Sequence, residues 1–371
     1  MPERAYTEYV KSAFRPLVAA TGRLTLLDQL FTKSIPKEKQ EKLFRQFKIL
    51  RLDQSQVITL PDGGFLAKLT GGEHEIFLVC SSSMNEEEGR NFVDDCSGVH
   101  GLIPVEFDES IFLIVAHEIS GRFKIKDEYR SKARASDFVD VVDAEYQGHE
   151  VADLRDTYRP VLAFEIPVDC SLSGADIFDL ALEILGSHAA LRSPIIDDDI
   201  AKQVVALRGG QTCTSENLVQ ALIASQWRYS FLELYRCLEA LYFFPWVRSF
   251  KKSTKSEMGV DELRKYCRDN LRWREKEKES IAELFEIVNS EKIKDREKHI
   301  SVFKELVNNE NSSRSSYGYR LYSIRNSLVH HENKDSIEVG MPGFEDWRLL
   351  TLYVAVFLEE FNTMYSRDFT Q

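Results

Sequence analysis

The chain has 371 residues, of which 43% are hydrophobic and 29% are charged, and its formal net charge at pH 7 is −12. This length is comfortable for two domains, and the composition is that of an ordinary soluble globular protein. The negative charge argues against a protein that coats nucleic acid non-specifically, because such binding is driven by positive charge, but it leaves room for a small basic cleft.

Targeting and metal-binding signals are not evident in the sequence. The first residues, "MPERAYTEYVKSAF", are charged and lack the apolar centre of a signal peptide, so we do not expect secretion. The most apolar window, "WRLLTLYVAVFLEEF" (347–361), contains three charged residues and is too short to span a bilayer, which predicts a buried helix. The six cysteines have no CxxC or zinc-like spacing. We therefore expect a cytoplasmic protein with reduced thiols, no membrane partner, no metal and no cofactor.

The first 200 residues predict a mixed α/β domain. Residues 56–80 hold three short apolar runs that are separated by Asp62-Gly63-Gly64 and by Gly71-Gly72. These turn residues favour a β-meander. Further apolar runs, rich in β-branched and aromatic residues, predict strands at 110–119 and 159–168, and apolar residues at helical spacing predict a helix at 175–192.

The character of the chain changes near "LRGGQTCTSE" (207–216), where a glycine pair and a Thr/Ser cluster are typical of a linker and a helix cap. One long helix is predicted over 215–244, ended by Pro245, and its buried stripe is predicted to be Phe231, Leu234, Leu238 and Leu241. Further helices are predicted at 260–273, 276–290, 294–309, 314–331 and 344–366. The predicted fold class is α+β, with a mixed α/β sensor or regulatory domain at 1–210 and an all-helical domain at 211–371.

The segment "YSIRNSLVHHEN" (322–333) combines Arg325 and Asn326 with the adjacent histidines His330 and His331 near the end of a predicted helix. An arginine and a histidine at this spacing are by themselves a weak signal. A purely structural interpretation is open: Arg325 pairs with Glu332 or Asp335, and the histidines cap the last carbonyls of the helix, where positive charge is favoured.

Together with the upstream aromatic-rich stretch "YRCLEALYFF" (235–244), the motif resembles the HEPN superfamily, whose ribonuclease members carry R-x(4–6)-H, often with a polar residue after the arginine. In particular it looks like the Apea-like HEPN branch of prokaryotic anti-phage defence. The resemblance covers about residues 215–370. It implies a metal-independent endoribonuclease that is a homodimer through its C-terminal bundle, with RNA as substrate and an antitoxin or a phage-derived trigger as further partners.

The resemblance also implies roles for individual residues. The nucleophile is the 2′-hydroxyl of the RNA, so the protein moves protons and neutralises charge. His330 would be the general acid and base, and Arg325 would hold the phosphate through its forked donors. Asn326 would orient the histidine or a phosphate oxygen. Glu239 and Arg320 are supporting candidates, and His331 is the alternative catalytic histidine.

Helix geometry constrains this motif. Five residues at about 100° each place His330 about 140° around the helix axis from Arg325. Either the helix frays at Val329, or the site is composite and two chains meet across a two-fold axis. The dimerising habit of the family favours the composite site. We also expect the apolar helix at 347–361 to carry more hydrophobic surface than an end helix needs, as a dimer interface would.

Several other features are interpreted as structural. The basic runs at 247–255 and 264–276 predict solvated helix faces, and Arg236 and Glu239 are predicted to form an i, i+3 surface pair. Three histidines adjoin a glutamate without a metal-binding pattern, which indicates strand or loop histidines: His74, His117 and His149. Two alternative functions stay open, a non-catalytic dimerisation or RNA-binding module and a toxin that a separate antitoxin silences.

Overall fold

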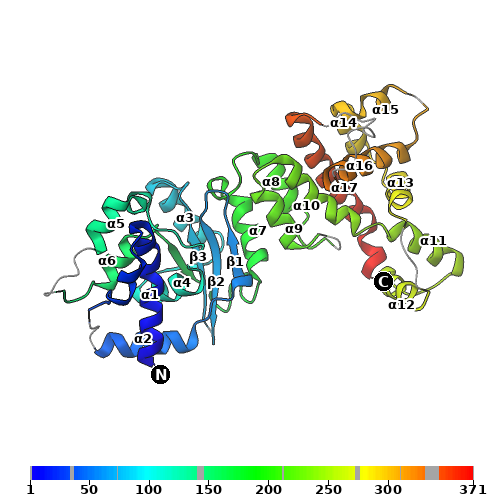
Figure 1. The fold of residues 1–371 in the computed structure, drawn as a ribbon. Helices are drawn as coiled ribbons and strands as arrows, with labels where there is room; N and C mark the ends of the chain where they lie inside the picture. Colours follow the sequence, from blue (N-terminus) through cyan, green and yellow to red (C-terminus); the bar gives the residue numbers. More distant parts are fainter. Residues whose placement is uncertain are drawn as a thin grey trace. The chain divides into compact units, whose positions relative to one another are not determined.

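The structure is a computed structural model in which two compact units are distinguished by their internal packing, Met1–Ala181 and Leu182–Gln371. The first unit contains a five-stranded sheet, and the described part of the second unit is helical (Figure 1). The predicted α+β class is confirmed. The residues that the structure describes are 2–33, 37–72, 74–139, 146–210, 213–271, 276–309, 311–330 and 342–370.

The sheet of the first unit is antiparallel throughout, with the strand order β1-β2-β3-β5-β4. The predicted β-meander is confirmed as its first three strands. Both turns of the meander place a glycine at positive φ, +78° at Gly63 and +62° at Gly72, where glycine avoids the strain of other residues. The strands are β1 (Val57–Thr59), β2 (Phe65–Gly71), β3 (His74–Cys80), β4 (Ile103–Val105) and β5 (Leu162–Glu165), the last within the predicted 159–168.

Helices cover both faces of this sheet. On one face α1 (Pro2–Thr21) and α4 (Glu109–Glu118) pack over the strands and bury Phe14 and Phe112 in a core with Phe65 (Figure 1). On the other face α3 (Glu86–Gly98) sets Phe92 edge-to-face against Phe164. The remaining helices of this part are α2 (Lys37–Ile49), α5 (Lys132–Val139) and α6 (Val151–Asp156), with 3₁₀ helices at Leu24–Asp28, Gln54–Gln56 and Asp127–Arg130. The predicted helix at 175–192 is α7 (Ile177–Ser187), and the division between the units falls within it.

The strand predicted at 110–119 is wrong, because this segment forms α4. Residues Ile111–Ala116 are all buried, so the segment lacks the polar face whose period would distinguish a helix from a strand. The start of the helix is set by Asp108, whose side chain accepts hydrogen bonds from the backbone N–H groups of Ser110 and Ile111.

The second unit contains more and shorter helices than the sequence predicted. The prediction of a single helix at 215–244 is wrong, because the helix is interrupted at 224–226. Pro245 lies in the first turn of a new helix, where no hydrogen bond needs its missing N–H. The predicted stripe of Phe231, Leu234, Leu238 and Leu241 is buried as expected. The helices are α8 (Asp198–Val205), α9 (Ser215–Ile223), α10 (Trp227–Glu239), α11 (Phe244–Thr254), α12 (Val260–Leu271), α13 (Glu277–Ile287), α14 (Glu291–Glu297), α15 (Lys304–Asn308), α16 (Arg314–His330) and α17 (Phe344–Thr370), with 3₁₀ helices at Ala189–Leu191 and Ser301–Phe303.

The residues just before the glycine pair at 209–210 pack with the second unit. In α8, Gln203 Nε2 donates to Glu359 Oε2 of α17 at 2.9 Å, and Asp197, which caps α8, lies 2.7 Å from Arg348 Nη2. The division between the units therefore falls after Ala181, whereas the sequence placed the boundary near residue 210. Glycine content marks a flexible backbone, but the burial of α8 decides which core it joins.

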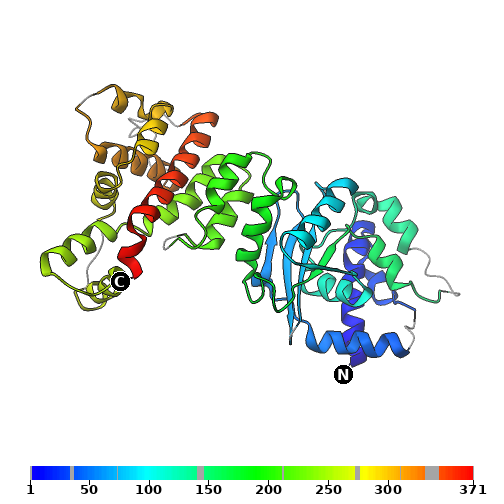
Figure 2. The ribbon, with the colours of Figure 1, turned by 180° about the vertical axis from the view of Figure 1, so that it is seen from behind.

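The long helix α17 lies at the centre of the second unit, with α10, α14 and α8 against it (Figure 2). Its apolar residues from Leu350 to Leu358 are buried within the unit, so the expectation of surplus hydrophobic surface on this helix is wrong. The buried helix predicted from the window 347–361 is confirmed. Within the described residues, no helix has both the length and the apolar character needed to cross a membrane.

Candidate functional site

The Arg/His motif lies on α16, which is packed along α13. Gly318 allows this close approach, because a Cβ atom there would lie 2.9 Å from the carbonyl oxygen of Ile281. The backbone stays helical through His330, so the helix does not fray at Val329. The side chain of His330 and all of His331, Glu332 and Asp335 lie outside the described residues.

Arg325 is the residue of the motif that the structure describes most fully. Its Nη2 lies 2.6 Å from Oε1 of Glu239, the last residue of α10, and its Nη1 donates to Oδ1 of Asn326 at 2.9 Å. The side chain of Arg325 is 18% exposed and that of Glu239 is 27% exposed. The structure therefore brings together three of the candidate residues, from two helices that are far apart in the sequence.

The Arg325–Glu239 pair retains capacity for a further ligand. A guanidinium group has five N–H donors, and these two contacts account for two of them. The partial exposure of both side chains keeps the site open to solvent. An anion such as a phosphate can therefore approach Arg325 without full separation of the ion pair.

Burial raises the pKa of Glu239, while the guanidinium of Arg325 opposes this rise and Glu277 adds to it. A carboxyl that is costly to ionise is stabilised as an anion by the fixed positive charge beside it. Glu239 thus holds Arg325 in place at the cost of a partly desolvated carboxylate.

A pair of buried tyrosines adjoins this ion pair and was missed by the sequence analysis. Tyr235 and Tyr242 share a hydrogen bond of 2.7 Å between their hydroxyls, and burial raises the pKa of both. The charges of Glu239 and Arg325 act on both phenols in opposite directions. Both tyrosines lie in the aromatic-rich stretch at 235–244, which the sequence had marked without assigning them a role.

One supporting candidate and one predicted contact are placed elsewhere by the structure. Arg320, a supporting candidate, pairs with the exposed Glu305 at 3.3 Å, and no hydrogen bond or ion pair between described residues joins it to Glu239 or Asn326. Arg236 pairs with Glu233 at 2.7 Å instead of forming the predicted pair with Glu239. The prediction was wrong because Glu239 is occupied by Arg325, which no local spacing rule reveals.

The N-terminal end of α16 is held by a buried polar cluster. The Glu297 side chain, 3% exposed, accepts from Nη1 of Arg314 through both carboxylate oxygens, at 2.6 Å for Oε1 and 2.5 Å for Oε2. Tyr353 of α17 donates to the same carboxylate at 2.6 Å. Because three helices meet here, the cluster fixes where α16 starts and therefore where Arg325 lies.

The predicted basic helix face at 247–255 forms α11 and lines a hollow of about 530 Å³. Arg248, Lys251 and Lys252 face it together with Glu283 and Asp368. Within the part of the chain that the structure describes, the two lysines form no ion pair, so this hollow is a second place where the helical unit presents positive charge.

Metal chemistry and disulfides are not features of the described residues, and the chain has no match among known proteins. Among the described residues, no group of three or more His, Cys, Asp or Glu side chains has an arrangement that holds a metal ion. None of the six cysteines, all of which lie in the described ranges, forms a disulfide. No family model, no curated protein and no solved structure matches this chain.

Proposed function

We propose that this protein is a metal-independent endoribonuclease of the HEPN type, which acts in the cytoplasm in prokaryotic anti-phage defence or as a toxin. The observation that carries the proposal is the setting of Arg325. It lies next to Asn326 on α16, half-buried against Glu239, and the same helix continues through His330.

In the proposed reaction the 2′-hydroxyl of the RNA attacks the adjacent phosphorus and loses its proton to a base. The 5′-oxygen of the next nucleotide leaves and takes up a proton. His330 accepts the proton of the 2′-hydroxyl as the base and donates a proton to the 5′-oxygen as the acid. Arg325 donates to the phosphate oxygens as negative charge accumulates on them, and Glu239 keeps the guanidinium oriented before the substrate binds. The products carry a 2′,3′-cyclic phosphate and a free 5′-hydroxyl.

The helical register supports a composite site in a homodimer. Because α16 is helical through His330, positions 325 and 330 lie about 140° apart around its axis. A histidine from a second chain, related by a two-fold axis, meets Arg325 without distortion of the helix. The register of α16 supports the dimer, whereas α17 does not, because its apolar side is covered within one chain.

A second function is favoured by one observation. The charge of Arg325 is already balanced by Glu239, as in a purely structural ion pair. In that case the helical unit is a non-catalytic dimerisation or RNA-binding module.

Incubation of RNA with the purified protein in EDTA tests the proposal. We expect cleavage to persist, with cyclic phosphate ends, while DNA of the same sequence survives because it lacks the 2′-hydroxyl. His330→Ala and Arg325→Ala should each lower the cleavage rate by about 10²–10⁴-fold.

His331→Ala is the matched control for the register and should retain most of the activity. If His331 is essential and His330 is dispensable, the catalytic histidine is His331, one residue later than proposed. Loss of cleavage in EDTA, or products with 5′-phosphates, contradicts the proposed chemistry. Binding of RNA without cleavage favours the non-catalytic module.

A further inference from the structure

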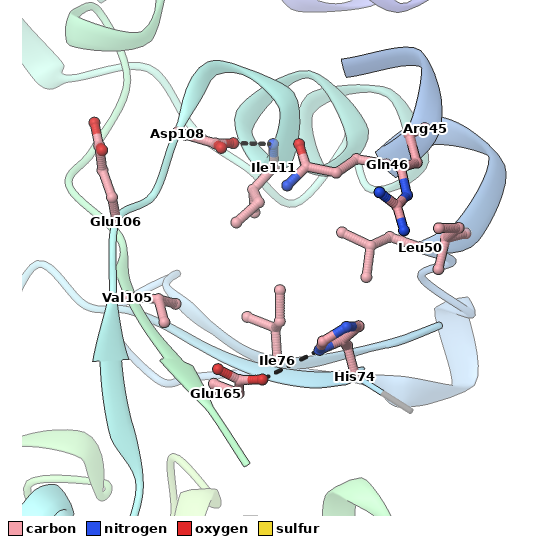
Figure 3. A pocket seen from close by; sticks show the side chains of 11 residues that line it. Arg45, Gln46, Leu50, His74, Ile76, Val105, Glu106, Asp108, Ile111 and Glu165 are labelled. Carbon is pink, nitrogen blue, oxygen red and sulfur yellow. Dashed lines mark hydrogen bonds and ion pairs between the residues drawn. The ribbon is translucent and has the colours of Figure 1, made fainter. Parts of the chain in front are cut away.

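The first unit contains a pocket of about 480 Å³ that none of the functions above uses. Figure 3 shows that α2 and the start of α4 form one wall and that the ends of β3, β4 and β5 form the other. Its volume lies within the range of about 300–1,000 Å³ that is usual for small-molecule and cofactor sites.

The middle of the pocket is apolar. Ile76 from the sheet and Ile111 from α4 face each other across it, with Val105 beside them (Figure 3). Ile49 of α2 also lines the pocket and is 38% exposed. An aliphatic surface open to water favours a ligand with a flat or apolar body.

The two sides of the pocket carry different charges. Arg45 and His74 lie on one side, with the Glu165 carboxylate next to His74, and Glu106 lies on the opposite side (Figure 3). Among the described residues, neither Arg45 nor Glu106 has a side-chain partner. His74 is oriented by a 3.1 Å contact between its Nδ1 and Oε1 of Glu165, and no side chain in the described ranges pairs with its Nε2.

Not every polar group in the pocket is available. Asp108 is occupied by the cap of α4, where it accepts from the backbone N–H groups of Ser110 and Ile111. Gln46 accepts a hydrogen bond from the hydroxyl of Ser110 through Oε1, so its NH₂ group is left as a donor. Glu165 is engaged through Oε1 with His74. The donors that remain, Arg45, Gln46 and His74, lie across the aliphatic side chains from the acceptor Glu106.

We infer that this pocket binds a guanine mononucleotide, with the phosphate at Arg45 and His74, the base on the apolar middle, and the donor edge of the base at Glu106. An arginine with a neighbouring imidazole suits a phosphate. A carboxylate accepts hydrogen bonds only, and guanine presents two adjacent donors, its ring N–H and its exocyclic NH₂, to a single carboxylate. Adenine has one such donor on this edge.

The size of the pocket separates this ligand from simpler ones. An inorganic phosphate uses only the side with Arg45 and leaves the apolar middle and Glu106 without contacts. A free amino acid carries its two charges on one carbon atom, too close together to reach both sides. The inference does not rest on the proposed ribonuclease activity, because the pocket belongs to the first unit.

Isothermal titration calorimetry with the full chain tests this inference. The titrations use the Arg325→Ala protein as the background, so that a phosphate held at the ribonuclease site does not contribute heat. We expect guanosine monophosphate to bind at least about tenfold more tightly than adenosine monophosphate, the scale of one charge-assisted hydrogen bond. Inorganic phosphate should bind more weakly than either.

Three variants assign the contacts. Arg45→Ala should weaken both nucleotides by about tenfold or more, whereas Glu106→Gln should remove the preference for guanine and leave adenosine monophosphate unchanged. Lys48→Ala removes a positive charge from the same helix outside the pocket and should change neither affinity. Far-ultraviolet circular dichroism of each variant confirms that it is folded.

Any of four outcomes overturns the inference. They are no heat with guanosine monophosphate at about 1 mM, equal affinity for both nucleotides, phosphate binding as tight as nucleotide binding, and equal effects of Arg45→Ala and Lys48→Ala.

Discussion

Arg325 of α16 and Glu239 of α10 form an ion pair of 2.6 Å between Nη2 and Oε1, and this contact joins two helices that are far apart in the sequence. Both side chains are more than two-thirds buried. The pair therefore serves two ends: it contributes to the packing of the helical unit, and it orients the guanidinium that the proposed reaction needs.

A double-mutant cycle measures the interaction free energy between Arg325 and Glu239. Comparison of Arg325→Ala, Glu239→Ala and the double variant by urea unfolding should give a coupling of about 1–3 kcal/mol, the scale of a partly buried charged hydrogen bond. The neighbouring pair Arg236–Glu233, with Arg236 61% exposed, is the matched control and should give about 0.5 kcal/mol or less. Equal couplings for the two pairs would contradict a special role for Arg325.

The raised pKa of Glu239 predicts a pH dependence of stability. In the folded protein this carboxyl binds its proton up to a higher pH than in the unfolded chain. Its contribution to stability is therefore fully present below the unfolded pKa and is lost as the pH rises through the folded pKa. Relative to Glu239→Gln, which does not titrate, the wild-type protein should lose stability across this window. Urea midpoints of both proteins between about pH 4 and pH 8 measure the difference, and parallel pH profiles would refute it.

The composite site makes a sharp prediction for mixed dimers. A heterodimer with Arg325→Ala in one chain and His330→Ala in the other contains one intact site if each site takes its arginine and its histidine from different chains. Two affinity tags allow its purification, and it should cleave RNA at about half the wild-type rate per dimer, although both parent homodimers are inactive. An inactive heterodimer means that each chain completes its own site, and active protein that sediments as a monomer excludes the dimer altogether.

The packing of α8 predicts where the helical unit can be cut. Residues 182–371 should fold on their own, whereas residues 211–371 lose Ile200 and Val204, both fully buried. At about 1.5–3 kcal/mol for each buried side chain, the shorter fragment should be at least about 3 kcal/mol less stable. Urea unfolding followed by tryptophan fluorescence measures the stability of both fragments. Equal unfolding midpoints would show that the helical unit does not need α8 and would support a boundary near residue 210.

The outcome for individual elements shows what kind of information the sequence carried. The β-meander was predicted because Gly63 and Gly72 meet a local backbone requirement for positive φ. The helix α4 was mistaken for a strand because its apolar residues are buried on every side, which removes the periodic signal. The break between α9 and α10 was missed because the apolar pattern continues through it.

The sequence by itself determined the α+β class, the turns of the meander, the buried stripe of α10 and the presence of an arginine and a histidine on one helix, since each depends on residues close together in the chain. Only the tertiary structure decided that Glu239 is the partner of Arg325, that α8 joins the helical unit, and that Arg45, His74 and Glu106 line one pocket. The physical reason is the same in all three cases. Charge pairing and burial depend on distances in space, and chain folding brings together residues whose spacing in the sequence carries no signal of the contact.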